Sequence, residues 1–228
     1  ELRKAVIAKF GKRFHMVNEI VKTEEKYVAS LESLLQDYVV PMKESRVLPA
    51  EKIESFFQDF LLILGANRKL LAQLQQVFLC ESWAQFSERN LCVGQVFVDC
   101  APLLKVYSPF ISRFVEIEKG LSESIRKSKR FARFIDKVSG GVGKLDLDDR
   151  MIRPVQRLPR YRLLLEDTIK ATPPENPEHE MLQRGLAVIK QLAEFVNEQN
   201  RERDRKTRVT EIASALKMKV PHSSWVFH

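Results

Sequence analysis

The sequence predicts an all-α fold. Its 228 residues include only 8 glycines against 14 phenylalanines, and apolar residues recur every three or four positions instead of alternating as in a half-buried strand. With 44% hydrophobic residues, the chain can bury a substantial core, in one large domain or two small ones. No run of about 18 apolar residues is present, so we expect no membrane-spanning helix.

A first helix is predicted between residues 13 and 39, where apolar residues keep helical spacing. They are Phe14, Val17, Ile20, Val21, Val28, Leu31, Leu35 and Tyr38. Pro41 is expected to end this helix, because proline cannot donate the helical hydrogen bond. A second helical block follows between residues 51 and 79, with a break expected at Gly65. Its core stripe consists of Ile53, Phe56, Phe57, Phe60, Leu61, Leu64, Leu70, Leu71, Leu74 and Phe78.

Pro102 interrupts the next apolar segment, residues 93–107, and we expect a bend or two shorter helices there. Helical spacing continues over residues 110–118 and 121–138. Four apolar residues of the latter stretch are predicted to be buried, namely Phe131, Phe134, Ile135 and Val138. Above them lies the densest basic cluster of the chain, Arg126, Lys127, Lys129, Arg130 and Arg133. This cluster is either a solvated helix face or a surface that attracts an acidic partner or anionic lipid.

The central segment, residues 150–172, has a helical pattern with two distinct faces. At 100° per residue, one side forms a core stripe. The stripe consists of Met151, Val155, Leu158, Tyr161, Leu165 and Ile169. The opposite side carries Asp149, Ile152, Gln156, Arg160 and Leu163. An isoleucine and a leucine beside a glutamine and an arginine are typical of a protein-binding surface, and a solvated face with two stray apolar residues is the alternative.

A final helix is predicted from Glu178 to near Lys217, after the helix-breaking residues 172–177. Its core stripe consists of Leu182, Leu186, Ile189, Leu192, Phe195 and Val196. Residues 201–206 are charged on all sides, so we expect this part of the helix to project from the body. A weak apolar edge follows, made of Val209, Ile212, Ala213 and Leu216. Residues 223–228 have the pattern of the start of a strand.

Charge and reactive side chains exclude several function classes. The net charge is +8, but 30 acidic residues are interspersed among 38 basic ones, so no groove for a nucleic acid is expected. Cys80, Cys92 and Cys100 have neither paired spacing nor a histidine partner, which predicts reduced cytosolic thiols. No histidine stands at metal-ligand spacing, and no nucleophile motif is present. The glycine-rich residues 139–144 fail the P-loop pattern. We expect no metal, no cofactor and no covalent catalysis.

Two segments carry a family resemblance. Residues 152–165, Ile-Arg-Pro-Val-Gln-Arg-Leu-Pro-Arg-Tyr-Arg-Leu-Leu-Leu, strongly resemble the third conserved region of Dbl homology (DH) domains, which are guanine-nucleotide exchange factors for Rho-family GTPases. Residues 19–31 contain Thr23-Glu24 and Tyr27-Val28 and resemble the first conserved region. The resemblance covers residues 10–205 and implies an elongated bundle of about six major helices with a long C-terminal helix. Residues 206–228 would be a helical extension and linker toward a pleckstrin homology (PH) domain.

The resemblance also implies roles for individual residues. The residues around Glu24 on their own predict an ordinary exposed helix glutamate. The resemblance implies instead that Glu24 would contact switch I of the GTPase. Gln156, Arg160 and Asn197 would contact switch II. Ile152 would contact the β2–β3 region, where isoleucine favours a Rac GTPase. The family usually has lysine where this chain has Arg153, and the two are not equivalent donors.

The function implied is that of an exchange factor that acts by binding, without covalent chemistry. Its partner would be a Rho-family GTPase of the Rac, Rho or Cdc class, preferably nucleotide-free, from which it releases GDP so that GTP can load. The alternative is an inactive helical adaptor that binds a protein partner or an anionic membrane. A cytoplasmic location is expected, with membrane recruitment through a PH domain.

Overall fold

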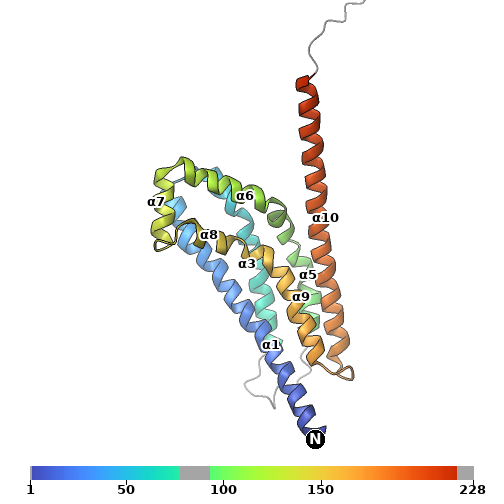
Figure 1. Ribbon diagram of the computed structural model, residues 1–228. Helices are drawn as coiled ribbons and strands as arrows, with labels where there is room; N and C mark the ends of the chain where they lie inside the picture. Colours follow the sequence, from blue (N-terminus) through green and yellow to red (C-terminus); the bar gives the residue numbers. More distant parts are fainter. Residues whose placement is uncertain (1, 78–92, 220–228) are drawn as a thin grey trace, which may run out of the picture.

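The structure, a computed structural model, describes residues 2–77 and 93–219, and within these ranges it contains helices and no strand. The bundle is elongated (Figure 1). Six helices have 12 residues or more: α1 (Leu2–Ser33), α3 (Ala50–Val77), α5 (Val93–Leu104), α6 (Tyr107–Lys127), α9 (Arg153–Ala171) and α10 (Glu178–Lys219). Shorter elements are a π-helix (Leu34–Val39), α2 (Val40–Glu44), α7 (Lys129–Val138) and α8 (Lys144–Met151). The all-α prediction is confirmed.

The chain passes through Pro41 without leaving the helix, so the predicted end there is wrong. Leu34–Val39 widen into the π-helix, and α2 starts directly afterwards. The π-helix changes the spacing of the hydrogen bonds before Pro41, since the Val40 N–H bonds the Leu35 carbonyl five residues earlier, and this widened turn accommodates the proline. The helix ends instead at Ser45 and Arg46, and Arg46 adopts a φ of 47°.

The second block is one continuous helix, so the break expected at Gly65 is also wrong. A glycine in a helix costs about 1 kcal/mol, which the burial of Ile63, Leu64 and Leu70 on either side outweighs. Most of the predicted stripe is buried, but Leu61 lies on the exposed side. Phe78 falls outside the described residues.

The middle of the chain divides into separate helices. α5 continues through Pro102 and ends at Leu104, and α6 begins at Tyr107, so the two helices expected here are present but the break lies just after the proline. The helical stretch predicted over 121–138 is interrupted at Ser128, whose extended backbone and hydroxyl cap α7 by accepting a hydrogen bond from the Phe131 N–H at 3.1 Å. Of the four residues predicted to be buried, Phe131 and Ile135 are buried, whereas Phe134 and Val138 are only half-buried.

The central segment is two helices instead of one. α8 and α9 meet at Ile152, because Pro154 lacks an N–H and its ring conflicts with the carbonyl four residues earlier. The predicted core stripe on α9 is confirmed, with Leu158, Tyr161 and Leu165 fully or almost fully buried.

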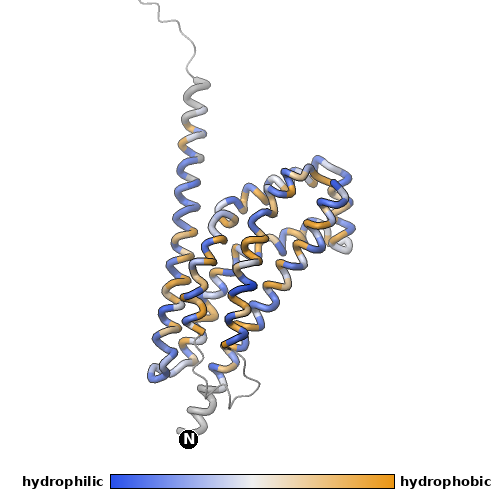
Figure 2. The backbone as a smooth tube through the Cα atoms, turned by 180° about the vertical axis from the view of Figure 1, so that it is seen from behind, coloured by the Kyte–Doolittle hydropathy of each residue, from blue (hydrophilic) through white to orange (hydrophobic). Residues whose placement is uncertain are grey.

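α10 begins at Glu178 as predicted and runs far beyond the bundle (Figure 1). Its buried stripe is Leu182, Ile189, Leu192 and Val196. Phe195, predicted to be core, is 43% exposed. The projecting part is mostly hydrophilic (Figure 2). Within it, Val209 and Ile212 of the expected apolar edge are exposed.

Close contact between α5 and α10 fixes the base of the long helix. A Cβ on Gly94 would fall on the Met181 backbone, and a Cβ on Gly185 would lie 2.9 Å from the Gly94 carbonyl oxygen. Farther along, Arg203 donates hydrogen bonds to the Ser112 carbonyl and to Glu116 on α6. α10 is thus held along its first half and at the point where it leaves the bundle.

Some predictions fall outside the described residues. These are the thiols Cys80 and Cys92 and the strand start at 223–228. Cys100 is a buried free thiol. Among the described helices, none is long and apolar enough to cross a membrane.

Candidate functional site

Three helices, α1, α9 and α10, form one side of the bundle (Figure 1). α9 packs against both α1 and α10 (Figure 1). α9 is antiparallel to α1, because Arg160 pairs with Glu19 at 2.8 Å whereas Arg157, earlier in α9, pairs with Glu24, later in α1. The short turn before Glu178 makes α10 antiparallel to α9.

The predicted polar face of the central segment lies at the surface. Gln156 and Arg160 are exposed, Leu163 is 46% exposed, and Asp149 is exposed on α8. Ile152 is half-buried at the junction of α8 and α9, where it lines a small pocket together with Phe114, Glu118, Asp148, Asp149 and Met151. The pattern interpreted as a contact surface is therefore accessible, with an apolar depression at its α8 end.

Asn197 lies on α10 at the level of Arg160. Lys190 and Glu166 form an ion pair at 3.3 Å, which sets the register between α10 and α9. Seven residues after Lys190, Asn197 occupies the same side of its helix. Arg160 lies six residues before Glu166, about the same distance along the antiparallel helix. The exposed Asn197 therefore lies at the level of Arg160 along the bundle, on the neighbouring helix.

Glu24 is not on that surface. Its side chain is 0% exposed and forms an ion pair with Arg157, which is only 7% exposed. The Tyr161 hydroxyl donates to Glu24 Oε2 at 2.7 Å, while no described residue hydrogen-bonds Oε1. Burial raises the pKa of the Glu24 carboxyl, and the nearby Arg157 charge partly offsets this effect. The carboxylate expected to reach a partner is therefore covered in this structure.

A buried polar network surrounds the ion pair. The Arg157 guanidinium lies between two rings, 4.7 Å from the Tyr27 centroid and 4.5 Å from the Tyr161 centroid. Asn67 Oδ1 is 2.8 Å from the Tyr161 hydroxyl and 3.1 Å from the Tyr107 hydroxyl. Burial raises the pKa of all three tyrosines well above its ordinary value. They remain neutral donors, and the network joins α1, α3, α6 and α9.

A shallow groove between α1 and α9 lies above this network. Its lining is Thr23, Lys26, Tyr27, Ser30, Arg153, Gln156, Arg157 and Arg160. Glu24 and Glu19 pair with two of its arginines, so Lys26 and Arg153 make the groove basic, and hydroxyl and amide groups provide further donors. Such a groove can bind acidic or carbonyl-rich protein surface. Among the described residues, no group of three or more His, Cys, Asp or Glu side chains could hold a metal ion.

The sequence matches a known family over most of its length. The model of that family, described as the RhoGEF domain, aligns with residues 16–197. This chain belongs to the RhoGEF family. The matched range contains all seven predicted contact residues, from Glu24 to Asn197.

Relatives of this RhoGEF domain are similar across nearly the whole chain. Guanine exchange factor for Rac 30 of Dictyostelium discoideum is 32% identical over 220 residues, which cover 94% of this chain and 13% of that protein. Rho guanine nucleotide exchange factor 17 of Homo sapiens is 30% identical over 190 residues, 81% of this chain and 9% of that protein. The chain spans about a tenth of the length of these relatives.

Solved structures confirm the DH-type bundle. A structure of the Vav1 exchange factor superimposes with a TM-score of 0.78 at 24% identity, covering 89% of this chain and 53% of that one. The PDZ-RhoGEF DH/PH domains in complex with RhoA give a TM-score of 0.75 at 21% identity, covering 91% of this chain and 60% of that one. The fold of this RhoGEF domain is therefore that of a DH domain.

Sequence reasoning missed Arg157 and the ion pair that it forms. Arg157 lies on the buried side of α9, one turn before Tyr161. Glu24 likewise lies between Val17, Val28 and Leu31 on the core stripe of α1. Glu24 is an acidic residue within the apolar stripe of α1, and Arg157 is a basic residue within that of α9. Because buried charges need partners, this combination indicates a buried ion pair.

Proposed function

We propose that this domain is a guanine-nucleotide exchange factor for a Rho-family GTPase. The single observation that supports the proposal is that Gln156, Arg160 and Asn197 are all exposed, on the adjacent helices α9 and α10 of a RhoGEF-family bundle. Each is a hydrogen-bond donor with no place in the core. Their position beside the basic groove supports a polar protein partner.

Exchange follows from binding alone. If the domain binds the nucleotide-free GTPase more tightly than the loaded form, thermodynamic reciprocity weakens nucleotide binding by the same factor. GDP then dissociates, and GTP reloads the GTPase and displaces the domain. No covalent step is needed, so the side chains act by positioning and hydrogen bonding.

Glu24 has a different role in this proposal from that of the exposed residues. In the free domain it holds Arg157 at the floor of the groove. Direct contact with switch I of the GTPase requires the Glu24–Arg157 pair to open locally. The exposed donors on α9 and α10 need no such rearrangement, and they are therefore the better residues for a first test.

A Rac-class GTPase is the preferred substrate in this proposal. The support is Ile152 at the apolar pocket between α8 and α9 together with the 32% identity to the relative named Guanine exchange factor for Rac 30. A Rho-class partner is the competing choice, since another relative is named a Rho exchange factor.

The test is release of fluorescent GDP from purified Rac, Rho and Cdc-type GTPases. The chain is compared with Arg160→Ala plus Asn197→Ala. Each lost interfacial hydrogen bond costs about 1–3 kcal/mol, so the double variant should slow stimulated release by at least about 30-fold. The substrate is the class that the unchanged chain accelerates.

The matched control is Arg184→Ala plus Gln199→Ala. Arg184 also forms an exposed ion pair, at 2.7 Å with Glu180, but near the start of α10. Gln199 is exposed and points about 200° away from Asn197 around the helix. The control should retain full activity. Equal losses in both variants would reject the assigned surface, and no acceleration of any GTPase would favour the inactive adaptor.

A further inference from the structure

We infer that the tip of the bundle formed by α7 and the α7–α8 turn is a docking surface for an anionic lipid membrane. The geometry behind this inference is a row of basic side chains along α7, followed by two exposed apolar side chains, one in the α7–α8 turn and one in the first turn of α8. The tip lies at the end of the bundle remote from α10 (Figure 1). The inference does not depend on exchange activity.

The basic row occupies the outer side of α7. Phe131 and Ile135 face the core and are almost completely buried. Lys129, Arg133 and Lys137 follow at four-residue spacing on the opposite side, and all three are exposed. No ion pair joins them to a carboxylate anywhere in residues 2–77 or 93–219. Their charges are therefore available to an external anion.

Neighbouring residues leave the tip positive. Arg126 at the end of α6 is exposed, and Arg130 donates to the Ser45 carbonyl, which leaves its charge uncompensated. Lys127 is neutralised by Glu123 at 2.6 Å. Asp136 is the exposed carboxylate of α7 itself. On α7 itself, four cations without an ion pair thus oppose one carboxylate.

The turn after α7 and the start of α8 add an apolar component. Val142 in the turn is 58% exposed, and Leu145 in the first turn of α8 is 63% exposed. Gly140, Gly141 and Gly143 have φ values of 62°, 90° and 73°, which side chains rarely adopt. These glycines turn the chain sharply at the end of α7 and leave Val142 at the outside of the turn. Exposed apolar side chains beside cations are the combination that lies in a membrane interface.

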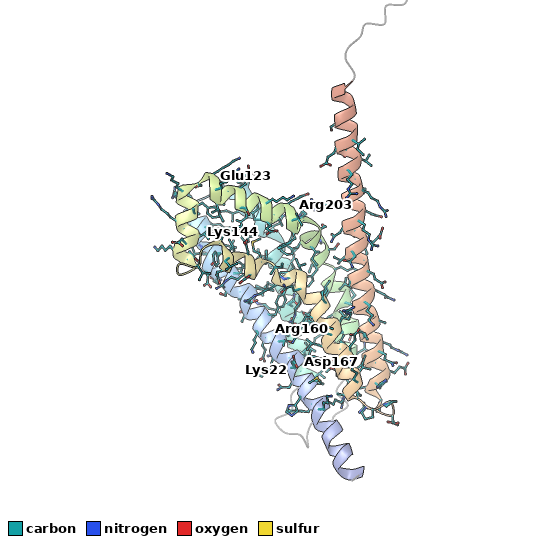
Figure 3. All side chains as sticks on the ribbon, in the orientation of Figure 1. Lys22, Glu123, Lys144, Arg160, Asp167 and Arg203 are labelled. Atoms are coloured by element: carbon teal, nitrogen blue, oxygen red, sulfur yellow. The ribbon has the colours of Figure 1, made fainter. Side chains whose placement is uncertain are left out.

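A membrane suits this tip better than a folded protein does. α7 forms an outer corner of the bundle (Figure 1), and a lipid surface requires no complementary pocket. Anionic headgroups match the charge of the row. Arg160 lies midway along the bundle while Lys144 lies at the tip (Figure 3). Docking through the tip therefore leaves the surface of α1, α9 and α10 accessible to another protein.

The experiment is flotation of the full 228-residue chain with two kinds of vesicle. One is pure phosphatidylcholine, and the other contains about one third phosphatidylserine. We expect binding to the anionic vesicles alone. Each cation near such a surface strengthens binding about fivefold, so Lys129→Gln, Arg133→Gln and Lys137→Gln together should weaken it about a hundredfold.

A charge-matched control removes three exposed arginines from the projecting part of α10, with Arg201→Gln, Arg205→Gln and Arg208→Gln. It should bind as tightly as the unchanged chain. Val142→Ser plus Leu145→Ser should abolish the binding that persists at high salt, where charge attraction is screened. Absence of binding to anionic vesicles overturns the inference, as does an equal loss in both triple variants or full retention by the α7 variant.

Discussion

Removing either half of the buried Glu24–Arg157 pair should destabilise the domain far more than replacing both halves. Glu24→Leu leaves the guanidinium, 7% exposed, without its carboxylate. Arg157→Met strands the Glu24 carboxylate in the same interior. Breaking a buried ion pair on one side costs about 3–5 kcal/mol, so the two losses would sum to about 6–10 kcal/mol if they were independent.

The double variant should lose only about 2 kcal/mol or less, because it buries no charge. Its leucine and methionine keep much of the original volume. The Tyr161 hydroxyl retains an acceptor, since Asn67 Oδ1 lies 2.8 Å away. A domain typically has 5–15 kcal/mol of stability, so each single variant remains folded enough to measure.

Urea unfolding followed by circular dichroism at pH 7 measures the four stabilities. The exposed pair Glu180 and Arg184 provides the control cycle; Glu180→Leu and Arg184→Met should each change the stability by less than about 1 kcal/mol. A double variant at Glu24 and Arg157 that loses the full sum of the single losses would show that the two side chains are not coupled, and the account of this network would fail.

Two further predictions concern local geometry, and both use the same unfolding assay. Gly94→Ala should destabilise the domain by about 2–3 kcal/mol, because the new Cβ meets the Met181 backbone. Gly65→Ala should stabilise the domain by about 0.5–1 kcal/mol, because nothing lies within 4 Å of the new Cβ. The opposite order of the two stabilities would contradict the α5–α10 contact. Tyr38→Phe should cost about 1 kcal/mol near neutral pH by removing the hydrogen bond to Asp146. Burial raises the pKa of Asp146, but Tyr38 and Arg150 outweigh it and the pKa is lowered. The stabilisation is therefore present above the ordinary aspartate pKa of about 3.9 and is lost as the pH falls through the lower folded-state pKa, so the difference between the variant and the unchanged chain should shrink at acid pH below that ordinary value.

Helical periodicity predicted which segments are helical, but the interruptions depended on tertiary structure. Pro41 could follow a helix because the preceding turn widened into a π-helix, a change that no local pattern indicates. Gly65 could remain helical because the residues around it pack into the core. Ser128 and Pro154 divided helices where the apolar period continued without a gap. Local signals therefore give candidate boundaries, and packing decides among them.

Burial was predicted wrongly for residues at the edge of an apolar stripe. Leu61 and Phe195 keep helical spacing and yet are substantially exposed. Their burial depends on whether a neighbouring helix covers that edge, which the spacing alone does not determine. Phe195 lines a groove between α5 and α10 with Val98 and Pro102, so it is covered on one side only.

The exposed residues of the candidate site were predictable from one helix. The buried ion pair could be predicted only by comparing the apolar stripes of two helices. Gln156 and Arg160 were recognised from the face of one helix. Glu24 lies on the buried stripe of α1, however, and a carboxylate there is unfavourable unless a cation on another element reaches it. Arg157 interrupts the stripe of α9 in the same way. Two interruptions of opposite sign within two core stripes satisfy each other only if the helices are adjacent, so together they predict both the ion pair and the packing of α1 against α9. Considered by itself, Glu24 was expected to be exposed. Comparing the two stripes within the same sequence indicates instead that it is buried.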